Sequence, residues 1–198
     1  MRKPILVALL LAGAAPALAA QGSYYARLGL TGASKLVTDE IIQPINTRQS
    51  LAPTLFAGVD LPLGKVYRVG LEGALSTGGF HADQKSTRYD LGTLRTASVT
   101  AQLVGPLMPG LEWRAGIGIL KYLPADKTGI FARGGPLVAI FGAGADYRRP
   151  ALKHWDLMLS ARYDYHRFTT DELQARGFAN TEGVHRISLS IGLARSSR

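Results

Sequence analysis

The sequence predicts an all-β fold, an eight-stranded antiparallel up-and-down transmembrane β-barrel. Two independent observations predict it. After residue 20 the chain divides into eight segments in which apolar and polar residues alternate with a period of two, which is the period of a β-strand. The connections between these segments are long and short in turn, as in barrels whose strands cross a membrane up and down.

The first twenty residues predict a cleaved signal peptide. Two basic residues, Arg2 and Lys3, precede a short apolar stretch, 5–12. The small residues at the expected cleavage point are Ala17, Ala19 and Ala20. Such a short stretch is typical of a leader that is removed rather than of a retained anchor. We therefore divide the chain into a signal peptide, 1–20, and a barrel domain, 21–198, and expect the mature protein to be exported.

The first four predicted strands are 23–33, 50–62, 66–77 and 91–104. Each is long enough to cross a bilayer at a tilt, which takes ~9–11 residues. Their apolar rows contain Tyr24, Ala26, Leu28 and Leu30; Leu55, Ala57, Val59 and Leu61; Tyr67, Val69, Leu71 and Leu75; and Ala97, Val99, Ala101 and Leu103. Their opposite rows contain Tyr25, Arg27 and Thr31; Thr54 and Asp60; Arg68, Glu72 and Ser76; and Thr96, Thr100 and Gln102. Each strand therefore has one apolar and one mainly polar face.

The last four predicted strands are 111–122, 136–148, 154–167 and 184–195. Their apolar rows contain Trp113, Ala115, Ile117 and Ile119; Leu137, Ala139, Phe141 and Tyr147; Trp155, Leu157, Leu159, Tyr163 and Tyr165; and Ile187, Leu189, Ile191 and Leu193. The alternation is weaker in 136–148, because Val138 and Ile140 fall in its otherwise polar row.

The row that faces water distinguishes a membrane barrel from a soluble one. The polar rows carry glycines, which fit a narrow interior, and charges of both signs, which suit a salt-bridge network in a small lumen. The predicted members of this network are Arg27, Asp60, Arg68, Glu72, Glu112, Arg114, Asp146, Asp156, Arg162, Asp164 and Arg186. The aromatic residues of the apolar rows lie mostly near strand ends, as at bilayer interfaces. The alternative is a soluble periplasmic ligand-binding barrel, which would need its aliphatic rows inside.

The connections give the second indication. The predicted long connections are 34–49, 78–90, 123–135 and 168–183, and the short ones between them are 63–65, 105–110 and 149–153. Short turns at one end and long loops at the other are typical of outer-membrane barrels. The long loops mix basic and aromatic residues, which suits contact with lipopolysaccharide phosphates.

No motif in the chain predicts catalysis, a cofactor or a metal site. We expect His81, which is close to Asp83 in sequence, to be exposed and inert. One polar row near the end of strand 154–167 consists of Ser160, Arg162, Asp164 and His166. An enzyme that modifies lipid A, a deacylase or an acyltransferase, could use such a row. Side chains two residues apart in a strand lie ~7 Å apart, so we interpret the row as part of the salt-bridge network and predict no enzyme.

The formal net charge of +9 suggests an acidic partner. The lysines and arginines are dispersed along the chain, and no nucleic-acid-binding motif is present. We therefore predict lipid headgroups as the acidic partner and no binding of DNA or RNA.

The start of the barrel domain resembles a known family. The sequence Gln-Gly-Ser-Tyr-Tyr-Ala-Arg-Leu-Gly-Leu at 21–30 is similar to the start of the small outer-membrane β-barrel domains, which include the OmpA transmembrane domain, OmpX and the opacity proteins. The resemblance continues as a strand pattern over the mature chain, although the chain lacks the C-terminal aromatic residue usual in that family. It implies an outer-membrane location, lipopolysaccharide as a neighbour, the barrel-assembly machinery as a partner in biogenesis, and a monomer. It also implies a structural or surface-interaction role without catalysis.

Overall fold

The computed structural model describes residues 22–39, 45–85, 87–127, 129–175, 177 and 182–195. The predicted signal peptide and its cleavage point lie outside these ranges. The two helices within them are short, η1 (Gly129–Phe131) and α2 (Asp171–Ala175). No helix in the described part of the chain is long and apolar enough to cross a membrane.

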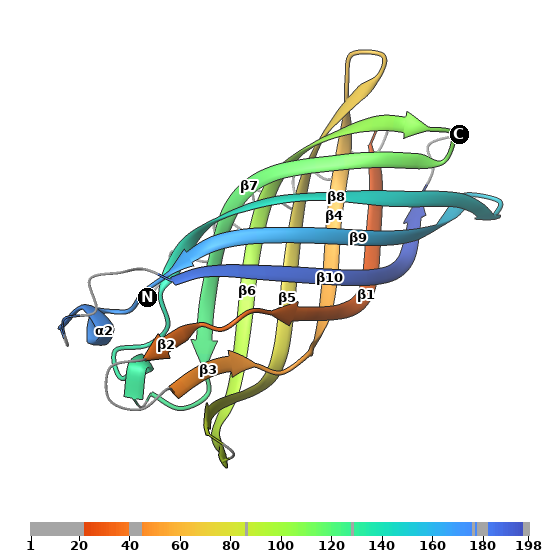
Figure 1. Cartoon of the computed structure of the whole chain (residues 1–198). Coiled ribbons are helices and arrows are strands. Elements are labelled where there is room, and N and C mark those ends of the chain that lie inside the picture. The colour runs from red at the N-terminus through yellow and green to blue at the C-terminus, as the bar shows by residue number, and fades with distance from the viewer. Residues whose placement is uncertain are drawn as a thin grey trace, which may run out of the picture.

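Eight long antiparallel strands close into a ring, as Figure 1 shows. They are β1 (Ser23–Ala33), β4 (Ala52–Leu63), β5 (Tyr67–Gln84), β6 (Thr87–Met108), β7 (Leu111–Pro124), β8 (Leu137–Leu152), β9 (Trp155–Phe168) and β10 (Glu182–Arg195). Each pairs with its neighbour in the chain, and pairing of β1 with β10 closes the ring. The predicted eight-stranded up-and-down barrel is therefore confirmed.

The apolar rows face out of the barrel and the polar rows face in. In β1 the side chains of Arg27 and Thr31 are 2% and 3% exposed, whereas those of Leu28 and Leu30 are 66% and 47% exposed. Tyr25 shares the inward row and is also buried. This is the inverse of a soluble barrel, in which the aliphatic side chains would fill the interior.

The two ends of the barrel differ, as predicted. At the short-turn end the strands reverse through turns at 64–66, 109–110 and 153–154. Gly64 and Gly110 have positive φ angles of 67° and 78°, which glycine adopts without the steric cost that a Cβ would bring. The long connections, η1 and α2 lie at the opposite end, which we call the long-loop end (Figure 1).

Two of the predicted long loops contain strands instead. Within 34–49 the chain forms β2 (Val37–Asp39) and β3 (Ile45–Gln49), and β3 pairs with the end of β5. The segment 78–90 continues β5 and β6 as a paired hairpin with a register shift between Gly79 and His81. Extended pairing beyond the ring satisfies backbone groups that a long loop would leave to water.

Candidate functional site

The part of the lumen toward the short-turn end contains one continuous ion-pair network. Ion pairs connect five arginines and five carboxylates without a break. Its members are Arg27, Arg68, Arg114, Arg148, Arg162, Asp60, Glu72, Glu112, Asp146 and Asp164. The equal number of positive and negative side chains explains how so many charges can lie inside a narrow barrel, since buried charges require partners.

Glu72 is the most heavily contacted carboxylate of the network. It is 1% exposed and forms ion pairs with Arg27 and Arg162. It also accepts hydrogen bonds from the hydroxyl of Tyr25 at 2.8 Å and from Nε2 of Gln102 at 3.1 Å. Four donors from three other parts of the chain therefore meet at one carboxylate.

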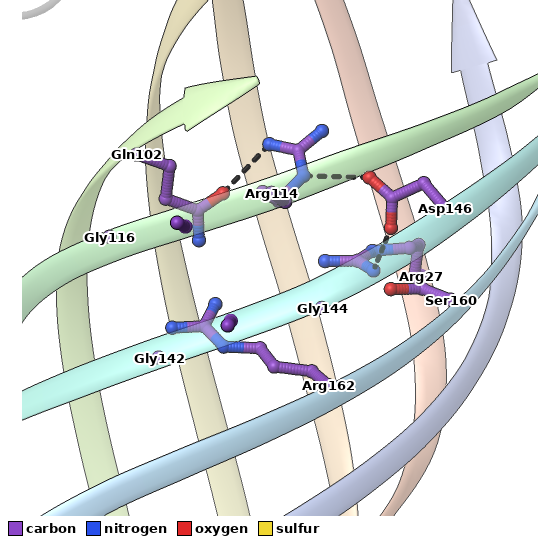
Figure 2. A pocket seen from close by; sticks show the side chains of 11 residues that line it. Arg27, Gln102, Arg114, Gly116, Gly142, Gly144, Asp146, Ser160 and Arg162 are labelled. Carbon is purple, nitrogen blue, oxygen red and sulfur yellow. Dashed lines mark hydrogen bonds and ion pairs between the residues drawn. The ribbon is translucent and has the colours of Figure 1, made fainter. Parts of the chain in front are cut away.

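Arg114 has a corresponding place among the cations. Its Nη1 and Nη2 donate to the two carboxylate oxygens of Asp60 at 2.9 and 3.0 Å, and its Nε donates to Asp146 at 2.6 Å. Figure 2 shows Arg114 between Asp146 and Gln102, above the glycines of β7 and β8. The cavity there is about 10 Å³, roughly the size of one water molecule. A Cβ at Gly142 would collide with Asp164, so the lumen is packed to the backbone.

The structure brings together nine of the eleven residues predicted for the network. Asp156 and Arg186 form no ion pair with any described residue; Arg186 donates a hydrogen bond to Thr96 at 3.3 Å. Sequence reasoning missed Arg148, which pairs with Asp60 at 2.9 Å and Glu112 at 3.0 Å. Arg148 shares the inward row of β8 with Asp146, so its position in the alternation was the available signal.

The side chains of the row at 160–166 contact other residues of the lumen. Ser160 pairs in register with Asp146 of β8, and Arg162 Nε donates to Asp164 at 2.6 Å. Nε2 of His166 hydrogen-bonds the Tyr122 hydroxyl at 2.7 Å. These contacts are those of packed lumen side chains, and among the described residues no serine forms a hydrogen bond with His166.

Between the network and the long-loop end, the lumen becomes apolar, which the sequence did not predict. Inward-facing residues of the strands pack against residues of the loops, η1 and α2. The buried members of this apolar layer are Leu36, Val37, Phe80, Leu94, Leu120, Tyr122, Phe131, Ile140, Phe168, Leu173 and Val184. Phe131 of η1 lies at its centre, with its ring centroid 5.5 Å from Phe80 and 6.0 Å from Phe168. The apolar layer therefore covers the charged network at the long-loop end.

His81 lies in the hairpin beyond the ring, and the prediction that it is exposed is wrong. It is 7% exposed, and its Nδ1 lies 3.4 Å from the Ser50 hydroxyl. Its Nε2 is 4.0 Å from Asp83, which is too far for a hydrogen bond, and that carboxylate is held by Arg48 and Arg88. The serine, histidine and aspartate thus lack the geometry of a catalytic triad.

The environment of His81 predicts a pH dependence. Burial lowers the pKa of His81, and nearby Arg88 lowers it further. The unfolded chain therefore takes up this proton at a higher pH than the folded hairpin does. The stability that the folded hairpin owes to neutral His81 is fully present above about pH 6.5. It is lost as the pH falls through the lowered pKa of the folded state. We expect backbone amides of β3 and the end of β5 to exchange with solvent faster at pH 5 than at pH 7.5, after correction for intrinsic rates.

The variant His81→Asn is the control for this prediction. It retains a polar side chain but does not titrate, so its corrected exchange in the hairpin should be the same at both pH values. An equal acceleration in His81→Asn and the parent protein would contradict the role of His81.

The outside of the barrel is an apolar band bounded by aromatic and basic residues. At the short-turn end Tyr24 packs on Trp155 at 5.8 Å and Tyr67 on Trp113 at 6.4 Å. On β7 Lys121 lies eight positions after Trp113, which at ~3.3 Å per residue and a ~40° tilt spans about 20 Å. The outward residues between them are Ala115, Ile117 and Ile119. This height is close to the ~25 Å apolar band that surrounds outer-membrane barrels.

Known structures share this architecture. No protein-family profile and no curated protein matches the sequence. Ail of Yersinia pestis, solved with the heparin analogue sucrose octasulfate, matches with a TM-score of 0.52 and 16% identity over 88% of this chain and 99% of that chain. OprG of Pseudomonas aeruginosa matches with a TM-score of 0.51 and 12% identity over 88% and 95% of the two chains. The outer-membrane protein AlkL, solved in DMPC bilayers, matches with a TM-score of 0.51 and 16% identity over 88% and 90%.

These matches extend over nearly the whole of each neighbour, at low identity. The chain therefore has the fold of small outer-membrane β-barrel proteins, and the predicted resemblance is confirmed at the level of the fold.

Proposed function

We propose that this chain is a small outer-membrane barrel with a structural or surface-interaction role and without catalytic activity. The observation that carries the proposal is the apolar band outside the barrel. Leu28, Ile117 and Leu189 are 62–66% exposed. Such a surface is costly in water and favourable in lipid, so its natural surroundings are the bilayer.

The filled lumen supports a role at the surface rather than transport through the barrel. The ion-pair network occupies the part of the lumen toward the short-turn end, and the apolar layer occupies the part toward the long-loop end. An ion entering this layer would exchange its water for mainly apolar side chains, which is costly. The protein then acts through its outer wall and its loops.

The orientation follows from the ends of the barrel. In outer-membrane barrels the short turns face the periplasm and the longer loops face outward. The long-loop end of this chain carries outward basic side chains, Arg95, Lys121 and Arg167, which suit the phosphates of lipopolysaccharide. Ail, which shares the fold, has been solved with a polyanion, sucrose octasulfate. We propose lipopolysaccharide as the neighbour of this end, the barrel-assembly machinery as the partner in biogenesis, and a monomeric barrel.

Cell fractionation tests this proposal. We expect the expressed full chain in the outer-membrane fraction, with faster gel migration before heating than after heating, because a closed barrel remains folded in detergent. We also expect the mass spectrum of lipid A to match that of cells carrying an empty vector. Recovery as a free periplasmic protein would refute the membrane role, and loss or gain of an acyl chain on lipid A would refute the non-catalytic role.

A further inference from the structure

A shallow hollow lies on the outer wall across β4–β8, and it ends at a lysine. Its volume is about 430 Å³, within the range of ligand sites. We call it the lysine hollow; its outward lining residues are Leu55, Ala57, Gly73, Leu75, Ala97, Val99, Ile119, Lys121 and Leu137. All of these except Lys121 are apolar, so the hollow has an apolar floor and a positively charged side chain at one end.

Small residues on neighbouring strands create the hollow. Ala57 of β4 pairs with Gly73 of β5, and Leu75 pairs with Ala97 of β6. A Cβ built on Gly73 would have its nearest neighbours, two carbonyl oxygens, at 3.9 Å. That spacing is ordinary contact, so a glycine is not required there by packing. Its absence of a side chain leaves a depression in an otherwise aliphatic wall.

Lys121 lines the end of the lysine hollow toward the long loops, and a second cation, Arg95, lies beside that end on β6, outside the lining. Lys121 pairs in register with Ala97, and its ammonium group donates to the carbonyl of Gly135 at 2.6 Å. Arg95, two residues from Ala97 on β6, has an exposed side chain with no ion-pair or hydrogen-bond partner among the described residues. Diagonal neighbours on paired strands lie ~7–8 Å apart, so both cations can reach one phosphate group.

A second hollow on the outer wall, larger than the lysine hollow, has no charged lining residue. It lies on β1 and β10, has a volume of about 590 Å³, and includes Gly32. The side chains around it are Leu28, Leu30, Leu51, Ile187, Leu189, Ser190 and Ile191. It has no charged lining residue, so it can hold an acyl chain but cannot hold a phosphate.

We infer that the lysine hollow is a binding site for a phosphorylated, acylated lipid of the outer leaflet, lipid A. One acyl chain lies along Ala57, Gly73 and Ala97, and a phosphate is held by Lys121 and Arg95. Charge complementarity carries the choice of occupant, because a neutral lipid would leave both cations unused. The inference rests on the proposed outer-membrane location, which places these cations at the level of the outer headgroups.

Native mass spectrometry of the folded full chain in detergent, titrated with hexaacylated diphosphorylated lipid A, tests the inference. We expect the double variant Lys121→Gln, Arg95→Gln to weaken the apparent Kd at least tenfold. We expect Gly73→Leu, which fills the floor without changing charge, to weaken it to a similar degree. Lipid A without its phosphates should bind parent and double variant equally.

Two controls separate the site from general attraction. Gly32→Leu fills the uncharged hollow, and Arg167→Gln removes an outward cation of β9, a strand that contributes no residue to the lining of the lysine hollow. Both should retain the Kd of the parent protein within about threefold, and heat-dependent gel migration verifies that every variant is folded.

Parent-like binding by either the charge variant or Gly73→Leu would overturn the inference, as would equal losses in the two controls. The proposed function would survive these results if the chain still fractionates with the outer membrane. Conversely, a chain recovered from the periplasm would refute the proposed function itself, whatever it binds in detergent.

Discussion

The substitution Glu72→Ala is expected to lower the free energy of unfolding of the barrel by roughly 3–5 kcal/mol, the cost of breaking a buried ion pair from one side. The change leaves Arg27 and Arg162 buried beside the space of the lost carboxylate, and removes an acceptor from Tyr25 and Gln102. Urea titration of the protein in lipid vesicles, followed by tryptophan fluorescence, measures the change.

Arg88→Ala is the matched control for Glu72→Ala. It also removes one partner of an ion pair, Arg88 with Asp83, but this arginine is 61% exposed in the hairpin beyond the ring. Water solvates the remaining carboxylate, so we expect the free energy of unfolding to be unchanged within error. Equal effects of the two substitutions would contradict a structural role for the lumen network.

Ile117→Arg is expected to destabilise the folded protein in vesicles by about 2–4 kcal/mol, the cost of a cation near the bilayer midplane. Ile117 is 62% exposed on the outward face of β7, midway between Trp113 and Lys121. In a soluble barrel, an arginine at such an exposed position would change stability by only ~0.5 kcal/mol. The same urea titration therefore distinguishes the two settings.

Val66→Arg provides the comparison at the edge of the band. Val66 is 58% exposed, but it lies in the turn between β4 and β5 at the short-turn end. Its arginine reaches headgroups and water, so the expected cost is about 0–1 kcal/mol. A cost at position 117 no larger than that at position 66 would argue that lipid does not surround the band.

The two faces of each strand could be predicted because a strand has an exact period of two. Leu55, Leu71 and Leu159 face outward, as their rows predicted, while Arg68 and Glu72 face the lumen. Once the outward direction of one row is known, hydrogen-bonded pairing carries the assignment around the ring.

The apolar layer could not be predicted from the same pattern. Leu120 and Tyr122 continue the inward row of Arg114, and Phe168 continues that of Asp164. Alternation tells which side a residue takes, but not the height at which the lumen stops being polar. That change depends on η1 and α2, which bring Phe131 and Leu173 from distant parts of the chain.

The hairpin beyond the ring and the choice of partners in the network escaped prediction for a related reason. Polar residues and two glycines around His81 are typical of a loop, and only pairing of 81–84 with β3 and β6 makes them strands. Likewise, the sequence places Arg148 inside, but the stagger of the strands decides that it meets Asp60 and Glu112.

The distribution of the network over the wall has a consequence for assembly. Its ten members come from six of the eight long strands, β1, β4, β5, β7, β8 and β9. In a partly assembled barrel, some lumen arginines would lack their carboxylate partners, and the hydrocarbon of the membrane cannot solvate them. The full set of ion pairs therefore forms only in the closed barrel. We expect β1 and β10 to pair in one cooperative step.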